Sequence, residues 1–148
     1  MQGTEMSEIK VNLDLSWKNG FKGQGVIASE HLNTTIAIPG VYGGSGNGSN
    51  PKELYVAAIA ACFVSTLSAI LSKSDVPVSE LTIATEAKSD EKEFTVLHNT
   101  KLVLSPGTTD ADIEKASKII TRADKSCTIG NMAREAGVVI TVNATVTH

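Results

Sequence analysis

Two cysteines are the residues whose chemistry the sequence makes most specific. Cys62 and Cys127 are the only cysteines in the 148-residue chain. Two are too few for a disulfide-stapled secreted scaffold or for a zinc site built from cysteines, but they are enough for one redox pair. We take a cytoplasmic, reducing compartment as the default, and there a cysteine pair is more often catalytic or sensing than structural.

Cys62 lies in an apolar, alanine-rich stretch, Ala58–Phe63. A small buried side chain without chemistry is the alternative to a reactive thiol at this position. The residue lies well past the start of the helix predicted below, and a helix dipole fades within about one turn of its N-terminus. A Cys62 thiolate would therefore gain nothing from that dipole, and we expect its activation to need a cation from elsewhere in the fold.

Cys127 lies near the start of a predicted helix, where backbone N–H groups favour a thiolate. The nearby cations Lys125 and Arg122 add positive charge. The alternative is a capping or half-buried residue. The wide separation of the two cysteines in the sequence leaves open whether they meet in space.

Other candidate residues are less specific. Glu53 has the position of a capping residue at the start of the long helix, and a cap is the simpler interpretation. The histidines, His31, His98 and His148, show no metal-ligand spacing, so we predict no metal site. The glycine-rich stretch Val41–Ser49 lacks the ending of a phosphate-binding loop, and we expect a flexible active-site loop or a connector.

Alternation of apolar and polar residues predicts a half-buried strand over Ile9–Trp17. The pair Asn19-Gly20 follows it as a turn signal. Two weaker strands are predicted over Gly25–Ser29 and Thr34–Ile38.

A long helix is predicted from Pro51 to about Ser72, with Asn50 as its N-cap and Glu53 in its first turn. Residues 54–71 carry no charge and approach the length of a membrane span. We reject a span because serine and threonine interrupt the run and alanine replaces bulky side chains. We expect instead a central helix that is covered on every side.

The second half of the chain predicts two strands, two helices and a closing strand. These elements are Leu81–Lys88, Glu93–Leu104, a helix capped at Thr109 and ending near Ala123, a short helix Thr128–Glu135 closed by Gly137, and Val138–Val146. No repeated βαβ unit appears, so the fold class is α+β with a largely antiparallel sheet. We expect a single domain over residues 1–148.

Composition excludes several classes of protein. Hydrophobic residues make up 41% and charged residues 20% of the chain, which is typical of a globular domain. The net charge of −3 gives no reason to expect binding to nucleic acid or to an anionic membrane. The polar opening, MQGTEMSEIK, does not have the pattern of a signal peptide.

Two separated motifs resemble those of the OsmC/Ohr family of thiol peroxidases. The segment Ser49–Phe63, which reads SNPKELYVAAIAACF, is similar to the family's run of Ser/Thr-Asn-Pro, alanines and Ala-Cys-Phe. The segment Ala123–Cys127, with the short helix and valine-rich strand after it, resembles the family's second cysteine region. The resemblance implies an OsmC-like fold, an intertwined homodimer around long central helices, and active sites at the subunit interface.

The resemblance also implies a reaction and its residues. Cys62 would attack an organic hydroperoxide and become a sulfenic acid, and Cys127 would resolve it to a disulfide that an external thiol reduces. The aliphatic surroundings of Cys62 favour an organic hydroperoxide over hydrogen peroxide, because an apolar tail gains from burial. No cofactor is implied.

The chain departs from the family's pattern at two positions. The family's activating glutamate follows the proline, where this chain has Lys52; Glu53 comes one step later, which is about 100° around a helix. The family's arginine from the N-terminal strands is also missing. Lys22 is our candidate for the cation beside Cys62, with Lys18 as the alternative, although a lysine cannot supply a bidentate fork. We interpret Glu53 as an orienting residue or only a cap. A redox-sensing or small-ligand-binding module, and a structural dimer with inert thiols, are the alternatives.

Overall fold

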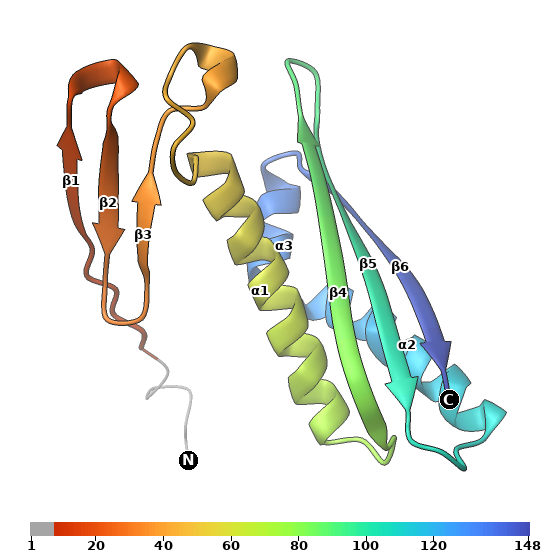
Figure 1. The fold of residues 1–148 in the computed structure, drawn as a ribbon. Helices are drawn as coiled ribbons and strands as arrows, with labels where there is room; N and C mark the ends of the chain where they lie inside the picture. The colour runs from red at the N-terminus through yellow and green to blue at the C-terminus, as the bar shows by residue number, and fades with distance from the viewer. Residues whose placement is uncertain (1–7) are drawn as a thin grey trace. The chain divides into compact units, whose positions relative to one another are not determined.

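Contacts within this computed structural model, which describes residues 8–148, divide the chain after Leu54 (Figure 1). One unit ends at Leu54 and the other runs from Tyr55 to His148, and each is described by itself. The expected single domain over residues 1–148 stays a prediction. The absence of a signal peptide was predicted from the polar first ten residues. Most of these lie outside the described residues.

The first unit is a three-stranded antiparallel sheet in the order β1-β2-β3. Its strands are β1 (Asp14–Lys18), β2 (Gln24–Ala28) and β3 (Asn33–Ile36). Asn19 and Gly20 turn the chain between β1 and β2 with φ angles of 69° and 64°. Asparagine and glycine tolerate this left-handed conformation best, which confirms the predicted turn.

The prediction of a half-buried strand over Ile9–Trp17 was wrong in its length and in its burial. The strand begins only at Asp14, and Leu15 and Trp17 are 62% and 42% exposed. An alternating pattern places apolar side chains on one face, but another layer must then cover that face. Within this unit no layer covers the apolar face of β1, so its side chains stay in solvent.

Helix α1 (Pro51–Ser72) begins where its capping residues predicted. The side-chain oxygen of Asn50 accepts a hydrogen bond of 2.9 Å from the backbone N–H of Glu53. The hydrogen bonds of the described residues do not include the return bond from the Glu53 carboxylate to Asn50. The cap is therefore complete without that carboxylate.

Only one face of α1 is buried within the described residues of a single chain. For a single chain, the expectation that other elements surround the helix on every side was therefore wrong. The buried residues, Ile59, Phe63, Leu67 and Leu71, recur every four positions. By length and composition α1 could cross a membrane, a test that the core helix of a soluble protein also passes, and 22% of its most apolar window is buried.

The sheet of the second unit has the order β4-β5-β6, with β4 (Val78–Ser89), β5 (Phe94–Leu104) and β6 (Val139–Thr147). Strands β4 and β5 are antiparallel, whereas β5 and β6 are parallel. The parallel pair exists because two helices, α2 (Asp110–Ser126) and α3 (Thr128–Glu135), carry the chain from the end of β5 back to the start of β6. With antiparallel pairing elsewhere between the strands, the predicted α+β class is confirmed.

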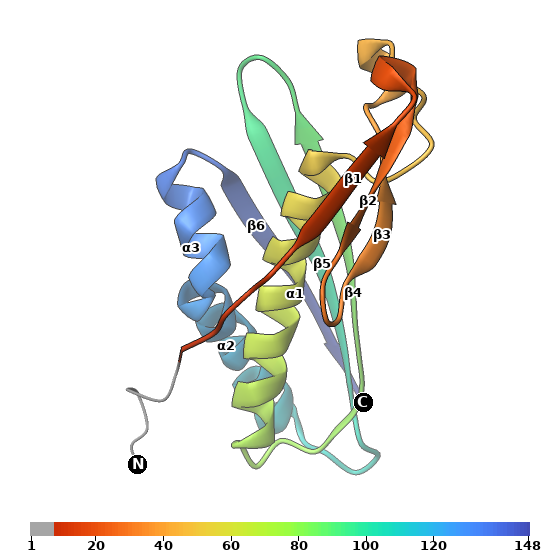
Figure 2. The same ribbon diagram turned by 90° about the vertical axis from the view of Figure 1, so that its left-hand side faces the viewer.

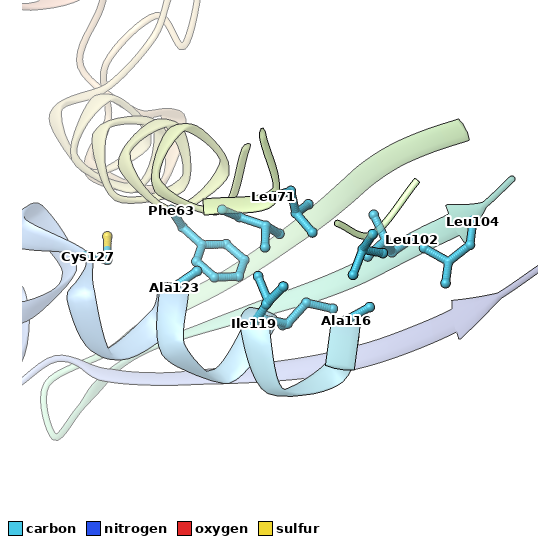
Figure 3. Close-up of a cluster of buried hydrophobic side chains, with 11 residues drawn as sticks. Phe63, Leu71, Leu102, Leu104, Ala116, Ile119, Ala123 and Cys127 are labelled. Carbon is cyan, nitrogen blue, oxygen red and sulfur yellow. The ribbon is translucent and has the colours of Figure 1, made fainter. Parts of the chain in front are cut away.

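The core of this unit lies between its sheet and its helices (Figures 2 and 3). Phe63, Leu67 and Leu71 of α1 pack with Leu102 and Leu104 of β5. From α2 come Ala116, Ile119, Ile120 and Ala123, and Cys127 stands at one end of the cluster. A capping box between Thr109 and Asp112 fixes the start of α2, as predicted. The core therefore holds α1 and the corner between α2 and α3 in one rigid cluster.

Candidate active site

The two cysteines meet at the corner between α2 and α3, although they are far apart in the sequence. Cys62 lies in the middle of α1 and is half-buried, and Cys127 joins α2 to α3 and is 2% exposed. Both thiols are free, and they are hydrogen-bonded to each other. The structure therefore brings together the two residues that the sequence proposed as nucleophile and resolving cysteine.

The sulfur of Cys62 is surrounded by hydrogen-bond donors. Burial raises the pKa of this thiol, but the backbone N–H of Ile129, the Cys127 thiol, the Thr66 hydroxyl and the backbone N–H of Thr128 donate to it. Together these hydrogen bonds outweigh burial and hold the pKa of Cys62 below its ordinary value. A lower pKa means more thiolate at neutral pH, and the thiolate is the nucleophile.

The donors from Thr128 and Ile129 belong to the first turn of α3. The first N–H groups of a helix have no partner inside it, and they carry the positive end of its dipole. Cys127 is the N-cap of α3, and the backbone N–H that acts on its sulfur is that of Gly130, so the N–H groups of Thr128 and Ile129 are left for Cys62. Within the second unit, the N-terminus of α3 thus supplies positive charge to Cys62, and the expected cation from elsewhere in the fold stays a prediction.

Cys127 has the opposite electrostatic environment from the one its position predicted. Burial is the largest cause that raises the pKa of Cys127, the Cys62 thiol and the Asp124 carboxylate raise it as well, and one backbone N–H from Gly130 lowers it; together they bring it to about 11. The charged groups that raise the pKa of Cys127 are thus the Cys62 thiolate and the Asp124 carboxylate, which act against the shift expected from Lys125 and Arg122. A helix start lowers a thiol pKa only when its N–H groups reach the sulfur and water is near enough to solvate the charge.

Gly130 allows α3 to pack against Cys127. A Cβ atom built on Gly130 would lie 3.1 Å from the Cys127 sulfur and 3.6 Å from Ile140 Cδ1. The first contact is tighter than most contacts of real Cβ atoms, so a methyl group here would require the sulfur or the helix to shift by a few tenths of an ångström.

Arg134 and Asp124 form an ion pair behind Cys127. Arg134 Nη2 lies 2.8 Å from Asp124 Oδ1, and the two side chains are mostly buried. The guanidinium also donates to the backbone oxygens of Asp124 and Ile140, each at 3.2 Å. One of the chain's two arginines is thus fully used in holding this corner together.

His98 lies beneath the site on β5. Its ring is stacked on Phe63 with 4.7 Å between ring centroids, and its Nδ1 is hydrogen-bonded to the Thr85 hydroxyl at 2.8 Å. Burial lowers the pKa of His98, with Asp124 opposing and Arg134 adding to the shift, so the imidazole is neutral at pH 7. His98 is therefore a buried core residue that packs on Phe63, the neighbour of Cys62 in the sequence.

The other predicted site residues belong to the first unit. Lys22 is an exposed residue of the turn Gly20–Lys22, and Glu53 is exposed in the first turn of α1. Their proposed roles beside Cys62 stay predictions. Within residues 8–148, no group of three His, Cys, Asp or Glu side chains is arranged to hold a metal ion.

The first unit also contains an apolar hollow of about 460 Å³. Its lining residues are Leu15, Trp17, Ile27, Ile36, Ala37, Ile38, Pro39, Tyr42, Asn50, Pro51, Lys52 and Leu54. The hollow includes the exposed apolar side chains of β1, so this face has both the shape and the composition of a surface that binds an apolar partner.

Sequence reasoning missed Thr66, Asp124, Arg134 and the N–H groups of α3 as parts of this site. Thr66 had a readable signal, because it lies four positions after Cys62 on a predicted helix and so shares its face. Asp124 also had one, because it lies three positions before Cys127 at the end of a predicted helix. Arg134 and the N–H groups of α3 had no signal that linked them to Cys62, because that link depends on the packing of α3 against α1.

The profile of the family described as OsmC-like protein matches residues 44–143. The matched range contains Cys62, Cys127 and Glu53 and excludes Lys22. The chain is similar to the uncharacterized protein YmaD of Bacillus subtilis, with 30% identity over 129 residues that cover 84% of this chain and 86% of YmaD.

A second relative is organic hydroperoxide resistance protein-like 2 of Staphylococcus epidermidis. It is 30% identical over 105 residues, which cover 68% of this chain and 71% of that protein. Among solved structures, an OsmC-like protein of unknown function from Vibrio cholerae has the same fold, with a TM-score of 0.74 and 17% identity, over 93% of this chain and 100% of the other.

Proposed function

The chain belongs to the OsmC-like family, and we propose that it is a cysteine-based peroxidase that reduces organic hydroperoxides with an external thiol. Its family includes proteins named for organic hydroperoxide resistance. The observation that carries the proposal is the contact between two free thiols whose pKa values are shifted in opposite directions.

The proposed cycle starts at Cys62. Its thiolate attacks the terminal oxygen of a hydroperoxide, the O–O bond breaks, and the departing alkoxide takes a proton to become the alcohol. Cys62 is then a sulfenic acid. The N–H groups of Thr128 and Ile129 and the Thr66 hydroxyl hold the thiolate for this attack.

Cys127 resolves the sulfenic acid. Its sulfur attacks the Cys62 sulfur, the S–O bond breaks, and the Cys127 proton leaves with the hydroxide as water, so a Cys62–Cys127 disulfide forms. Two electrons from an external thiol or dithiol then restore both thiols. Because its pKa is about 11, Cys127 stays protonated and does not compete with Cys62 for the peroxide.

We also propose that the chain acts as a homodimer. The support is the exposed apolar face of β1, with its hollow, and the outer face of α1, which carries the exposed small residues Ala57, Ala61 and Ser65. In a dimer, Lys22 would supply the cation at the thiolate and Glu53 would orient it. Analytical ultracentrifugation tests this: a dimer is expected, and replacing Leu15 and Trp17 by serine should yield monomers.

Turnover with cumene hydroperoxide and a dithiol tests the peroxidase. The wild-type chain should consume many equivalents, Cys62→Ser none, and Cys127→Ser about one. A reducing cytoplasm would supply the thiol that such a cycle needs. Failure of the wild-type chain with every dithiol tried would refute the proposal.

One observation favours a second candidate, a redox-sensing or ligand-binding module. Arg134 is occupied by Asp124, and Arg122 lies exposed on α2, so within the described residues of the second unit no arginine contacts Cys62. A sensor would be oxidised once by hydroperoxide and reduced slowly. A stoichiometric burst without continued turnover would therefore identify the sensor.

A further inference from the structure

The corner between α2 and α3 is fastened by side chains from α3. Cys127 alone separates Ser126, the last residue of α2, from Thr128, the first residue of α3. The final carbonyl groups of α2 have no partner within that helix. The backbone oxygen of Asp124 accepts from Arg134 Nη1 at 3.2 Å, and that of Lys125 accepts from Asn131 Nδ2 at 2.8 Å.

Arg134 makes four hydrogen bonds to three elements. Besides the Asp124 backbone, its guanidinium donates to Asp124 Oδ1 at 2.8 Å, to Asn131 Oδ1 at 3.1 Å and to the backbone oxygen of Ile140 at 3.2 Å. Its acceptors thus lie on α2, α3 and β6. A planar, five-donor guanidinium can serve these acceptors at once, whereas a lysine ammonium at the end of a flexible chain cannot hold the same directions.

The same corner directs the first N–H groups of α3. With one residue between the helices, the angle of α3 against α2 decides where the N–H groups of Thr128 and Ile129 point. Both donate to the sulfur of Cys62. A small rotation of α3 would lengthen these hydrogen bonds, and hydrogen bonds to a charged group weaken steeply when distance and angle are lost.

We propose that Arg134 is a positioning residue for Cys62: through Asp124 and Asn131 it holds the first turn of α3 on the Cys62 sulfur and thereby sets the reactivity of a thiol that it does not touch. The inference rests on the proposed role of Cys62 as the nucleophile.

The charged and titratable groups around this corner are few. Cys127 is the titratable group in contact with Cys62; Asp124 and Arg134 lie behind Cys127, and the neutral His98 of β5 is stacked on Phe63. Because Asp124 and Arg134 carry opposite charges, removing the guanidinium also leaves the carboxylate beside Cys127 without its partner. Arg134→Lys keeps the charge and removes only the planar fork.

Alkylation of the full chain by iodoacetamide from pH 5 to pH 10, with each cysteine followed by peptide mass spectrometry, tests the proposal. Arg134→Lys should move the midpoint of the Cys62 profile to higher pH and slow alkylation at pH 7 about threefold to tenfold. Asn131→Ala should move it in the same direction by less. The control is Arg122→Lys, which changes an exposed arginine of α2 and should leave the profile unchanged.

Circular dichroism shows which variants fold. If Arg134→Lys does not fold, Asn131→Ala decides the matter alone. Folded variants with the wild-type Cys62 profile would overturn the proposal, and so would faster alkylation of both cysteines, because that is the signature of a merely loosened corner. Alkylation uses no peroxide. A shifted profile in a chain that consumes no hydroperoxide would therefore refute the peroxidase and leave the positioning role standing.

Discussion

Cys62 and Cys127 share one corner of the molecule, but their surroundings differ in what reaches the sulfur. Four donors point at Cys62, two of them from the first turn of α3. Cys127 stands at the N-cap of that same helix, yet it receives one backbone N–H, is buried in the core, and lies beside the Asp124 carboxylate. The pKa of Cys62 is therefore lowered and that of Cys127 is raised.

The N-terminus of a helix therefore lowers the pKa of the thiol at which its N–H groups point. This thiol need not belong to the N-cap residue of that helix. The dipole of α3 acts on a residue of α1, across a helix–helix contact. Burial raises the pKa of the N-cap cysteine, Cys127, because a thiolate in the core loses its hydration. The two identical side chains thus differ in ionisation: one has a lowered pKa, and the other stays protonated at neutral pH.

The largest effect of this difference should appear in chemical selectivity. At pH 7 a thiol with a pKa near 11 is ionised in about one molecule in ten thousand, so Cys62 should react with iodoacetamide at least about 100-fold faster than Cys127. Peptide mass spectrometry after short exposure measures both rates. Equal alkylation rates of Cys62 and Cys127 in the folded protein would contradict the different environments assigned to the two thiols.

The pH dependence of stability should show opposite signs for the two thiols. Cys127 stays protonated in the folded state while it ionises in the unfolded state, so its stabilising contribution is lost as pH rises from the ordinary thiol range toward 11, by on the order of 2 kcal/mol. Cys62 has a lowered folded pKa, so its contribution is present above the ordinary thiol range and is lost as pH falls through the folded value.

Urea denaturation at several pH values, compared between the wild-type chain and each Cys→Ser variant, isolates these contributions from those of lysine and tyrosine. The difference from Cys127→Ser should shrink with rising pH, and the difference from Cys62→Ser should grow. The same sign for both cysteines would contradict the assigned environments.

Gly130→Ala should disturb the packing around Cys127 and lower the free energy of unfolding. The added methyl group would lie 3.1 Å from the Cys127 sulfur, and such overpacking costs about 1 to 3 kcal/mol. Denaturant unfolding measures the loss. Glu135→Ala, an exposed substitution on the same helix, is the matched control and should change stability by less than about 0.5 kcal/mol. An unchanged stability in Gly130→Ala would mean that α3 is packed more loosely than described.

Thr66→Val should have the smallest effect of these substitutions, and it should change the reactivity of Cys62. The substitution keeps the shape and removes one donor from the thiolate, so alkylation of Cys62 at pH 7 should slow about twofold to fivefold. Ser65→Ala, which removes a hydroxyl from the neighbouring exposed position, should leave the rate unchanged. Equal rates in Thr66→Val and the wild-type chain would remove Thr66 from the site.

Local signals in the sequence predicted the elements well. The bounds of α3, Thr128–Glu135, agree with the prediction, because Gly137, with φ of 98°, takes the left-handed conformation just past the helix. The caps at Asn50 and Thr109 likewise fixed the starts of α1 and α2. Signals of this kind depend on a few adjacent residues, which is why a single sequence reveals them.

Long-range features were harder to predict. Alternation along Ile9–Trp17 did not reveal that the apolar face would stay uncovered, and strand patterns did not reveal that β5 and β6 are parallel. The contact of Cys62 with Cys127 followed from the family resemblance and not from their spacing. The reversal of their electrostatics could not be read at all, because it arises from which sulfur the first turn of α3 approaches.

In the proposed cycle, Cys62 reacts first and Cys127 then resolves its sulfenic acid. The most direct measurement treats the reduced chain with one equivalent of cumene hydroperoxide and identifies the products by peptide mass spectrometry. We expect a Cys62–Cys127 disulfide in the wild-type chain and, in Cys127→Ser, a Cys62 sulfenic acid that dimedone traps. Free thiols after treatment, or oxidation of Cys127 in Cys62→Ser at the wild-type rate, would contradict the proposed cycle.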